Sequence, residues 1–127
     1  MTELLNGFPK PANCPEPGEC IRVERPEDGL AIVILDPPHR SLAVLDAPLL
    51  YDLDKVVQEL ENDSSLKAVV FAGRVPTQFA AGADIDGISS ITDKSEAHSV
   101  VNFVHGIFSR IESLKATTVA AVGGAVP

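Results

Sequence analysis

The chain has 127 residues, which is enough for one domain with a modest core. Hydrophobic residues make up 45% of it and charged residues 22%, as in an ordinary soluble globular protein. The net charge of −8 at pH 7 argues against nucleic acid and anionic membranes as partners. No apolar run approaches the roughly 18 residues that span a bilayer, and the N-terminus lacks a secretion signal. We therefore expect a cytoplasmic protein.

The N-terminal residues 1–19 contain four prolines and show little periodicity, so we expect an irregular arm there. Cys14 and Cys20 are the only cysteines. None of the three histidines stands at metal-ligand spacing from them. We therefore expect two reduced thiols and no metal site.

The first regular element is predicted to be a β-hairpin over residues 20–35. Residues 20–25 alternate between apolar and polar, as a half-exposed strand does. Residues 26–29 form a turn that ends in Gly29, and residues 30–35 are a continuous apolar run typical of a buried strand.

A β-α-β unit should follow the hairpin. Asp46 is a candidate N-cap, and Pro48 is tolerated in a first helical turn. Apolar residues at helical spacing then predict a helix over residues 49–60, and residues 66–72 read as the next strand. The two strands that flank this helix should be parallel.

A second helix should begin at Asp93, with an acid three residues later in Glu96. Its predicted buried face consists of Val100, Val101, Val104, Ile107, Phe108, Ile111 and Leu114. Residues 117–122 are predicted to be a third core strand. Because the chain stops soon after this strand, we expect an unfinished α/β repeat and an exposed apolar surface.

Between these elements lies a stretch of unusually small residues. Phe79 is followed by four residues with no side chain larger than methyl, then by Asp84. At a junction between a strand and a helix, such residues let a ligand approach unpaired backbone N–H groups. A tight turn whose small residues only satisfy packing is the alternative that this spacing leaves open.

The segment Phe79-Ala80-Ala81-Gly82-Ala83-Asp84-Ile85 resembles the F-x-A-G-A-D-[IL] signature of the enoyl-CoA hydratase/isomerase (crotonase) family. The resemblance runs from Ile21 to Pro127. Residues 35–38 and those that follow most resemble the hydratase part of multifunctional fatty-acid-oxidation α-subunits. The resemblance implies an α/β fold, the N-terminal part of a crotonase-like (ClpP/crotonase) spiral of β-β-α units, over residues 20–127.

The resemblance also implies an acyl-CoA thioester as substrate, with CoA as part of it and no separate cofactor. In the family two backbone N–H groups hold the thioester oxygen, and the first falls on Ala83. The second donor and the two catalytic glutamates of hydratases would lie beyond residue 127, so we expect this chain alone to be inactive. Relatives commonly form trimers or pairs of trimers, which implies a homo-trimer or hexamer.

Further substrate contacts carried over from the family are Ala81, Gly82, Asp84, Ile85, Arg40 and Leu42. Arg40 could pair with a CoA phosphate, although a solvated loop arginine is an equally good interpretation. The Asn-Ala-Leu-like triplet that many relatives have in this loop is missing here.

The sequence also allows other functions to be considered. A non-catalytic acyl-CoA-binding or assembly module of crotonase shape, and an unrelated parallel α/β domain, both remain open. Asp84, Asp86 or Glu96 could act as a general base only if burial raised its pKa, and capping is the more usual role of such residues. The acid spacing around Gly87 does not fit a calcium loop, and no dinucleotide-binding G-x-G-x-x-G occurs.

Overall fold

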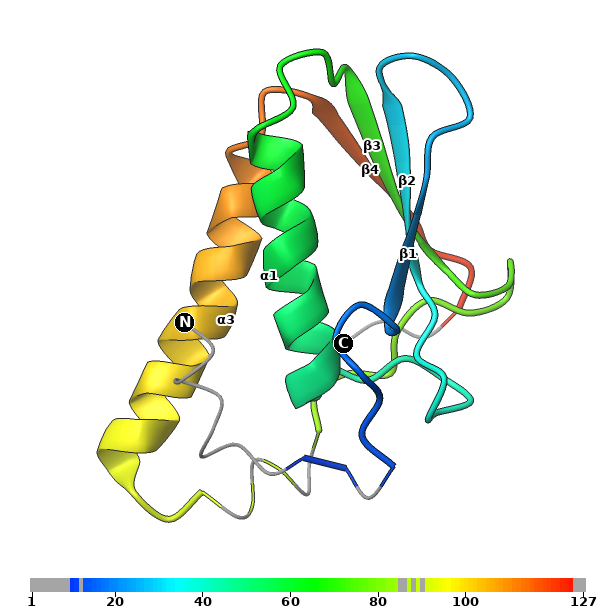
Figure 1. Cartoon of the computed structure of the whole chain (residues 1–127). Helices are drawn as coiled ribbons and strands as arrows, with labels where there is room; N and C mark the ends of the chain where they lie inside the picture. The colour runs from blue at the N-terminus through cyan, green and yellow to red at the C-terminus, as the bar shows by residue number, and fades with distance from the viewer. Residues whose placement is uncertain (1–9, 12, 85–86, 88, 90, 125–127) are drawn as a thin grey trace.

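The computed structural model describes residues 10, 11, 13–84, 87, 89 and 91–124. In this part of the chain four strands form one sheet in the order β1-β2-β3-β4, and two long helices lie side by side against one face of it (Figure 1). No helix among the described residues is long and apolar enough to cross a membrane.

The predicted hairpin is confirmed. Strands β1 (Ile21–Glu24) and β2 (Leu30–Leu35) pair antiparallel, with Ile21 opposite Leu35. Gly29 closes the turn with φ of 81°, a conformation that only glycine adopts without strain.

The predicted β-α-β unit is also confirmed. Helix α1 (Ala47–Glu61) connects β2 to β3 (Ala68–Gly73), and the two strands are parallel, with Leu30 opposite Ala68. Strand β3 begins two residues later than the pattern predicts. The reason is that the N–H of Leu66 donates to the carbonyl of Asp63 and closes a turn after the helix.

Helix α3 (Lys94–Glu112) and strand β4 (Thr117–Ala121) form as predicted, but their burial differs. The buried residues of α3 are Val100, Phe103 and Ile107, whereas Val101 and Phe108 are 49% and 39% exposed. A stripe at positions i, i+3 and i+7 is narrower than the predicted face, because α1 is the one described helix or strand against which α3 packs closely.

Strand β4 is not the core strand that the sequence predicts. It is the edge strand, paired only with β3, and all five of its residues are exposed. No other described element covers it closely enough to bury its side chains. The apolar residues of β4 therefore lie on a surface that no other described element covers.

The core lies between the sheet and the helices. Burial of each large aliphatic side chain contributes about 1.5–3 kcal/mol. The largest that are fully buried are Val33 and Val69 from the sheet, Leu49, Leu50 and Val57 from α1, and Ile107 from α3.

Charged side chains connect α3 and the segment before β1 to α1. Arg110 of α3 reaches back to Asp54 and Glu61, with nitrogen–oxygen distances of 2.6 and 2.9 Å. The carboxylate of Asp52 accepts hydrogen bonds from the backbone N–H groups of Gly18 and Cys20, each at 2.8 Å. The described residues at the end of the N-terminal arm are thus held against α1.

The two helix caps provide a matched pair of substitutions. Asp46 caps α1, is 0% exposed and also accepts hydrogen bonds from His39 and Arg40, whereas Asp93 caps α3 at an exposed position. We predict that Asp46→Ala lowers the free energy of unfolding by about 3–5 kcal/mol, because His39 and Arg40 also lose the carboxylate that accepts their hydrogen bonds. Asp93→Ala should lower it by only about 1 kcal/mol. Urea denaturation measures both, and equal losses would contradict this account.

The Cys20 thiol should make stability depend on pH in the alkaline range. Burial raises the pKa of Cys20 from 9.0 to about 12, with smaller contributions from the carboxylates of Asp52 and Asp46. Because the folded pKa is the higher one, this contribution is fully present below pH 9.0 and is lost as pH rises toward about 12. Between pH 9.0 and about 12 we expect the urea midpoint of the unaltered chain to fall. In Cys20→Ala the midpoint should fall by less, because this thiol is absent. Identical pH profiles would show that Cys20 does not titrate in this way.

Candidate functional site

The signature segment is held in place by backbone pairing with the loop that precedes α1. Ala81 donates its N–H to the carbonyl of Ala43 at 2.8 Å. Leu45 then forms a parallel β-bridge with Ala83: its N–H donates to the carbonyl of Gly82 at 2.8 Å, and its carbonyl accepts from Asp84 at 3.2 Å. Two chain segments that are far apart in the sequence therefore fix the backbone on both sides of Ala83.

Gly82 is required by the geometry of this pairing. Its φ is 103°, in the region where a side chain would be strained. The small residues therefore do more than leave the backbone bare, because one of them makes the turn possible.

The bridge leaves the peptide N–H of Ala83 unused. Since the groups that bond to Leu45 belong to Gly82 and Asp84, the N–H and carbonyl of Ala83 itself face away from that partner. Ala83 is exposed, and within the described part of the chain its N–H has no hydrogen-bond acceptor. A ligand with an acceptor oxygen could occupy this position.

Beside Ala83 lies a pocket of about 180 Å³ between the bridge and the two helices. Its walls are aliphatic except for one exposed histidine on α3. The lining residues are Leu45, Leu50, Ala83, Val100, Val101, Val104 and His105.

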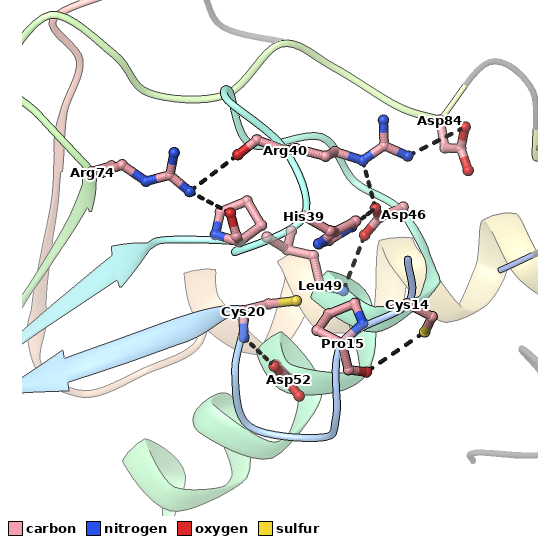
Figure 2. A network of polar contacts seen from close by, with 11 residues as sticks. Cys14, Pro15, Cys20, His39, Arg40, Asp46, Leu49, Asp52, Arg74 and Asp84 are labelled. Atoms are coloured by element: carbon pink, nitrogen blue, oxygen red, sulfur yellow. Dashed lines mark hydrogen bonds and ion pairs between the residues drawn. The ribbon is translucent and has the colours of Figure 1, made fainter. Parts of the chain in front are cut away.

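A cluster of polar and charged side chains around the buried Asp46 adjoins the bridge (Figure 2). The carboxylate of Asp46 is fully buried and accepts hydrogen bonds from His39 Nε2 and Arg40 Nε, both at 2.7 Å, and from the N–H of Leu49 at 3.2 Å. The outer nitrogen Nη2 of Arg40 lies 3.9 Å from Asp84 Oδ1. Arg40 thus connects the start of α1 to the signature segment.

The His39 side chain is 3% exposed, and its Nδ1 is buried without a hydrogen-bond partner in the described structure. The pairing of His39 with Asp46 looks like part of a general-base system. A general base must reach its substrate, however, and a ring this deeply buried offers no such access.

Arg74, which follows β3, holds the loop that carries His39 and Arg40. Its Nε lies 2.5 Å from Asp36 Oδ1, and its Nη2 donates to the carbonyl oxygens of Pro37 and Arg40. Figure 2 shows this guanidinium reaching into the loop. The loops after two neighbouring parallel strands are therefore tied to each other.

The predicted site residues Ala81, Gly82, Ala83 and Asp84 lie together, and Arg40 joins them through Asp84. Leu42 is half-buried in the loop next to Ala43, which pairs with Ala81. Ile85, Asp86 and residues 125–127 lie outside the described residues.

Sequence reasoning missed the buried cluster around Asp46. The N-cap pattern identified Asp46, but nothing in the spacing of His39 and Arg40 indicated that both would pair with it. Within the described ranges no group of three or more His, Cys, Asp or Glu residues could hold a metal ion.

The Gly-Gly pair after β4 packs close to the loop that leads into the signature segment. A Cβ atom on Gly123 or Gly124 would clash with the carbonyl oxygen of Pro76 or Thr77, respectively. Positions 123 and 124 therefore require glycine. The close approach of these two glycines brings the segment after β4 beside the segment after β3.

Comparison with known proteins places this arrangement in a family. A fatty acid oxidation complex subunit alpha from Idiomarina loihiensis is 35% identical over 99 residues, which cover 78% of this chain and 14% of that protein. The corresponding subunit from Shewanella oneidensis is 30% identical over 108 residues, covering 85% of this chain and 15% of that protein. The chain thus spans only a small part of these relatives.

Solved structures share the fold. DspI from Pseudomonas aeruginosa matches with a TM-score of 0.73 at 22% identity, covering 91% of this chain and 43% of that one. An enoyl-CoA hydratase from Bacillus anthracis matches with a TM-score of 0.71 at 21% identity, covering 83% of this chain and 40% of that one. The predicted crotonase-like fold is therefore confirmed.

The sequence profile of the family described as Enoyl-CoA hydratase/isomerase matches residues 25–127, which is most of the chain. The chain belongs to the enoyl-CoA hydratase/isomerase family.

Proposed function

We propose that this chain is part of an enoyl-CoA hydratase/isomerase-type protein that acts on acyl-CoA thioesters in fatty-acid β-oxidation. Ala83 N–H is then one donor of its oxyanion hole. The family supports the substrate class, and relatives named as fatty acid oxidation complex subunits support the metabolic role. The observation that carries the proposal is the N–H of the exposed residue Ala83, which has no hydrogen-bond acceptor among the described residues and lies at the edge of an apolar pocket.

The chemistry explains why a backbone amide suits this position. When a thioester passes toward an enolate-like state, negative charge develops on its oxygen, and a donor that is already fixed stabilises that charge without reorganising. Loss of one such donor typically lowers the rate by about 10²–10³. The bridge to Leu45 supplies the fixed orientation.

The pocket indicates how the substrate would lie. A thioester carbonyl held at Ala83 has the acyl chain on one side and the CoA arm on the other. The arm carries amides and phosphates, which lose hydrogen bonds in an aliphatic environment. The acyl chain therefore takes the pocket, and the arm leaves past Arg40 and Leu42, where Arg40 would contact a CoA phosphate.

The acid–base groups of hydration or isomerisation would come from outside the described residues. Among the described residues no carboxylate lines the pocket, and the carboxylate of Asp84 lies 3.9 Å from Arg40. The oxyanion arrangement suits hydration and double-bond isomerisation equally. The second candidate function, a non-catalytic acyl-CoA-binding or assembly module of crotonase shape, would use the same amide and pocket without these acid–base groups.

Assembly as a homo-trimer or hexamer in the cytoplasm is part of the proposal. Association of several copies is supported by exposed apolar side chains on α3, on β4 and in the segments that follow β3 and β4. The most exposed among the described residues are Val75, Val101, Phe108, Val119 and Val122.

We predict that the 127-residue chain binds butyryl-CoA and lowers the carbonyl stretching frequency of its thioester, but does not hydrate crotonyl-CoA above background. Replacement of Ala83 by L-lactic acid, which exchanges only its N–H for an ester oxygen, should abolish the frequency shift. Infrared difference spectra and a hydration assay measure the two effects. The same replacement at Ala116, at the opposite end of the sheet, is the control.

Two results would contradict this prediction. An unshifted carbonyl in the unaltered chain would remove Ala83 from the site. Turnover in the ordinary enzyme range of about 1–10³ s⁻¹ would show that the chain already contains its acid–base groups.

The size of the pocket should limit the acyl chain. A water molecule occupies roughly 30 Å³, and a methylene group is of similar size. The pocket of about 180 Å³ therefore has room for a short acyl chain only. Val101→Phe should weaken the binding of hexanoyl-CoA by about tenfold or more, equivalent to 1.4 kcal/mol, and leave acetyl-CoA unaffected. Val119→Phe, at an equally exposed valine on β4, is the matched control. A uniform effect on all chain lengths would place the acyl group elsewhere.

A further inference from the structure

Two features of the cluster around Asp46 have no role in the function proposed above. One is a carboxylate with 0% exposure that accepts three hydrogen bonds, from His39, Arg40 and Leu49. The other is the buried Nδ1 of His39, which has no partner in the part of the chain that the structure describes.

Stability alone does not account for this cluster. A buried ion pair is weak support for folding, because the loss of hydration offsets much of the attraction, and apolar replacements are often neutral or stabilising. An unpartnered buried imidazole nitrogen adds a further penalty. Capping of α1 needs only one acceptor, as the exposed Asp93 demonstrates for α3.

The position of the cluster relative to Ala83 suggests what it does. Asp46 directly follows Leu45, and Leu45 makes both hydrogen bonds of the bridge to the signature segment. From the other side, Arg40 extends from Asp46 to within 3.9 Å of Asp84, the residue after Ala83 (Figure 2). Asp46 is thus linked to both sides of the Ala83 peptide, through Leu45 along the chain and through Arg40 in space.

We propose that His39, Arg40 and Asp46 form a positioning unit that fixes the direction of the Ala83 N–H. This inference depends on the function proposed above. His39 Nε2 and Arg40 Nε both hydrogen-bond to Oδ2 of Asp46, and Nη2 of Arg40 lies 3.9 Å from the carboxylate of Asp84, within ion-pair distance. His39 and Asp46 are positioning residues, because their buried side chains do not reach the pocket lining.

Small displacements matter at such a donor. An oxyanion donor acts at about 2.7–3.1 Å from the oxygen, and a misplacement of about 1 Å can lower a rate by about 10²-fold. Loss of the His39 hydrogen bond should therefore reduce the polarisation of a bound thioester much more than its affinity.

The test uses the 127-residue chain with saturating butyryl-CoA and measures the carbonyl stretching frequency, the Kd and the thermal midpoint. The variants are His39→Leu, which removes the donor, and His39→Gln, whose amide can donate from a position near Nε2. Asp93→Asn, an N-cap substitution outside the cluster, is the control.

We expect His39→Leu to lose at least half of the frequency shift with a Kd within about threefold of the unaltered chain, a difference below 1 kcal/mol. His39→Gln should restore most of the shift, and Asp93→Asn should retain all of it. A full shift in His39→Leu would overturn the inference and leave the proposed function intact. No shift in the unaltered chain would overturn the proposed function and this inference together.

Arg40→Met serves as a second variant if His39→Leu melts below the assay temperature. The Arg40 side chain is 29% exposed, so its removal disturbs the core less. Because the readout is taken at saturation, a weaker CoA contact does not affect it. A reduced shift supports the positioning unit, and an undiminished shift overturns it.

Discussion

The parallel bridge between Leu45 and Ala83 is the constraint on which the rest of this site depends. It uses the carbonyl of Gly82 and the N–H of Asp84, so the N–H of the exposed residue Ala83 has no acceptor in the part of the chain that the structure describes. Gly82 makes this possible through its positive φ. A tight turn and a ligand-binding amide are therefore not competing interpretations of the small residues here, because the turn creates the free amide.

The fold brings the two loops that form the candidate site to one end of the sheet. Strands β2 and β3 are parallel, so the loops that follow them emerge at the same edge, where ligands bind in open α/β sheets. Arg74 ties the two loops together, and the aliphatic face of α3 closes the pocket from the side. The apolar pocket and the cluster around Asp46 thus both adjoin the bridge between Leu45 and Ala83.

Local patterns were sufficient to predict the hairpin, the N-cap at Asp46 and the β-α-β unit, because their determinants are alternation, capping and turn residues within a few positions. The burial of Val101, Phe108 and β4 could not be predicted in this way, since it depends on which neighbours cover each flank. The cluster of His39, Arg40 and Asp46 was missed for the same reason: their pairing is set by how the loop folds back on α1. The role of Ala83 came from a family resemblance, and the structure adds the geometry around it.

The central claim is that Ala83 donates its N–H to a thioester oxygen, and a crystal structure of the chain with a bound, unreactive acyl-CoA analogue tests it most directly. The account predicts a carbonyl oxygen about 2.7–3.1 Å from the nitrogen of Ala83, with the acyl chain directed toward Val101. A carbonyl bound elsewhere, or an Ala83 N–H that pairs with a protein acceptor in the complex, would contradict it.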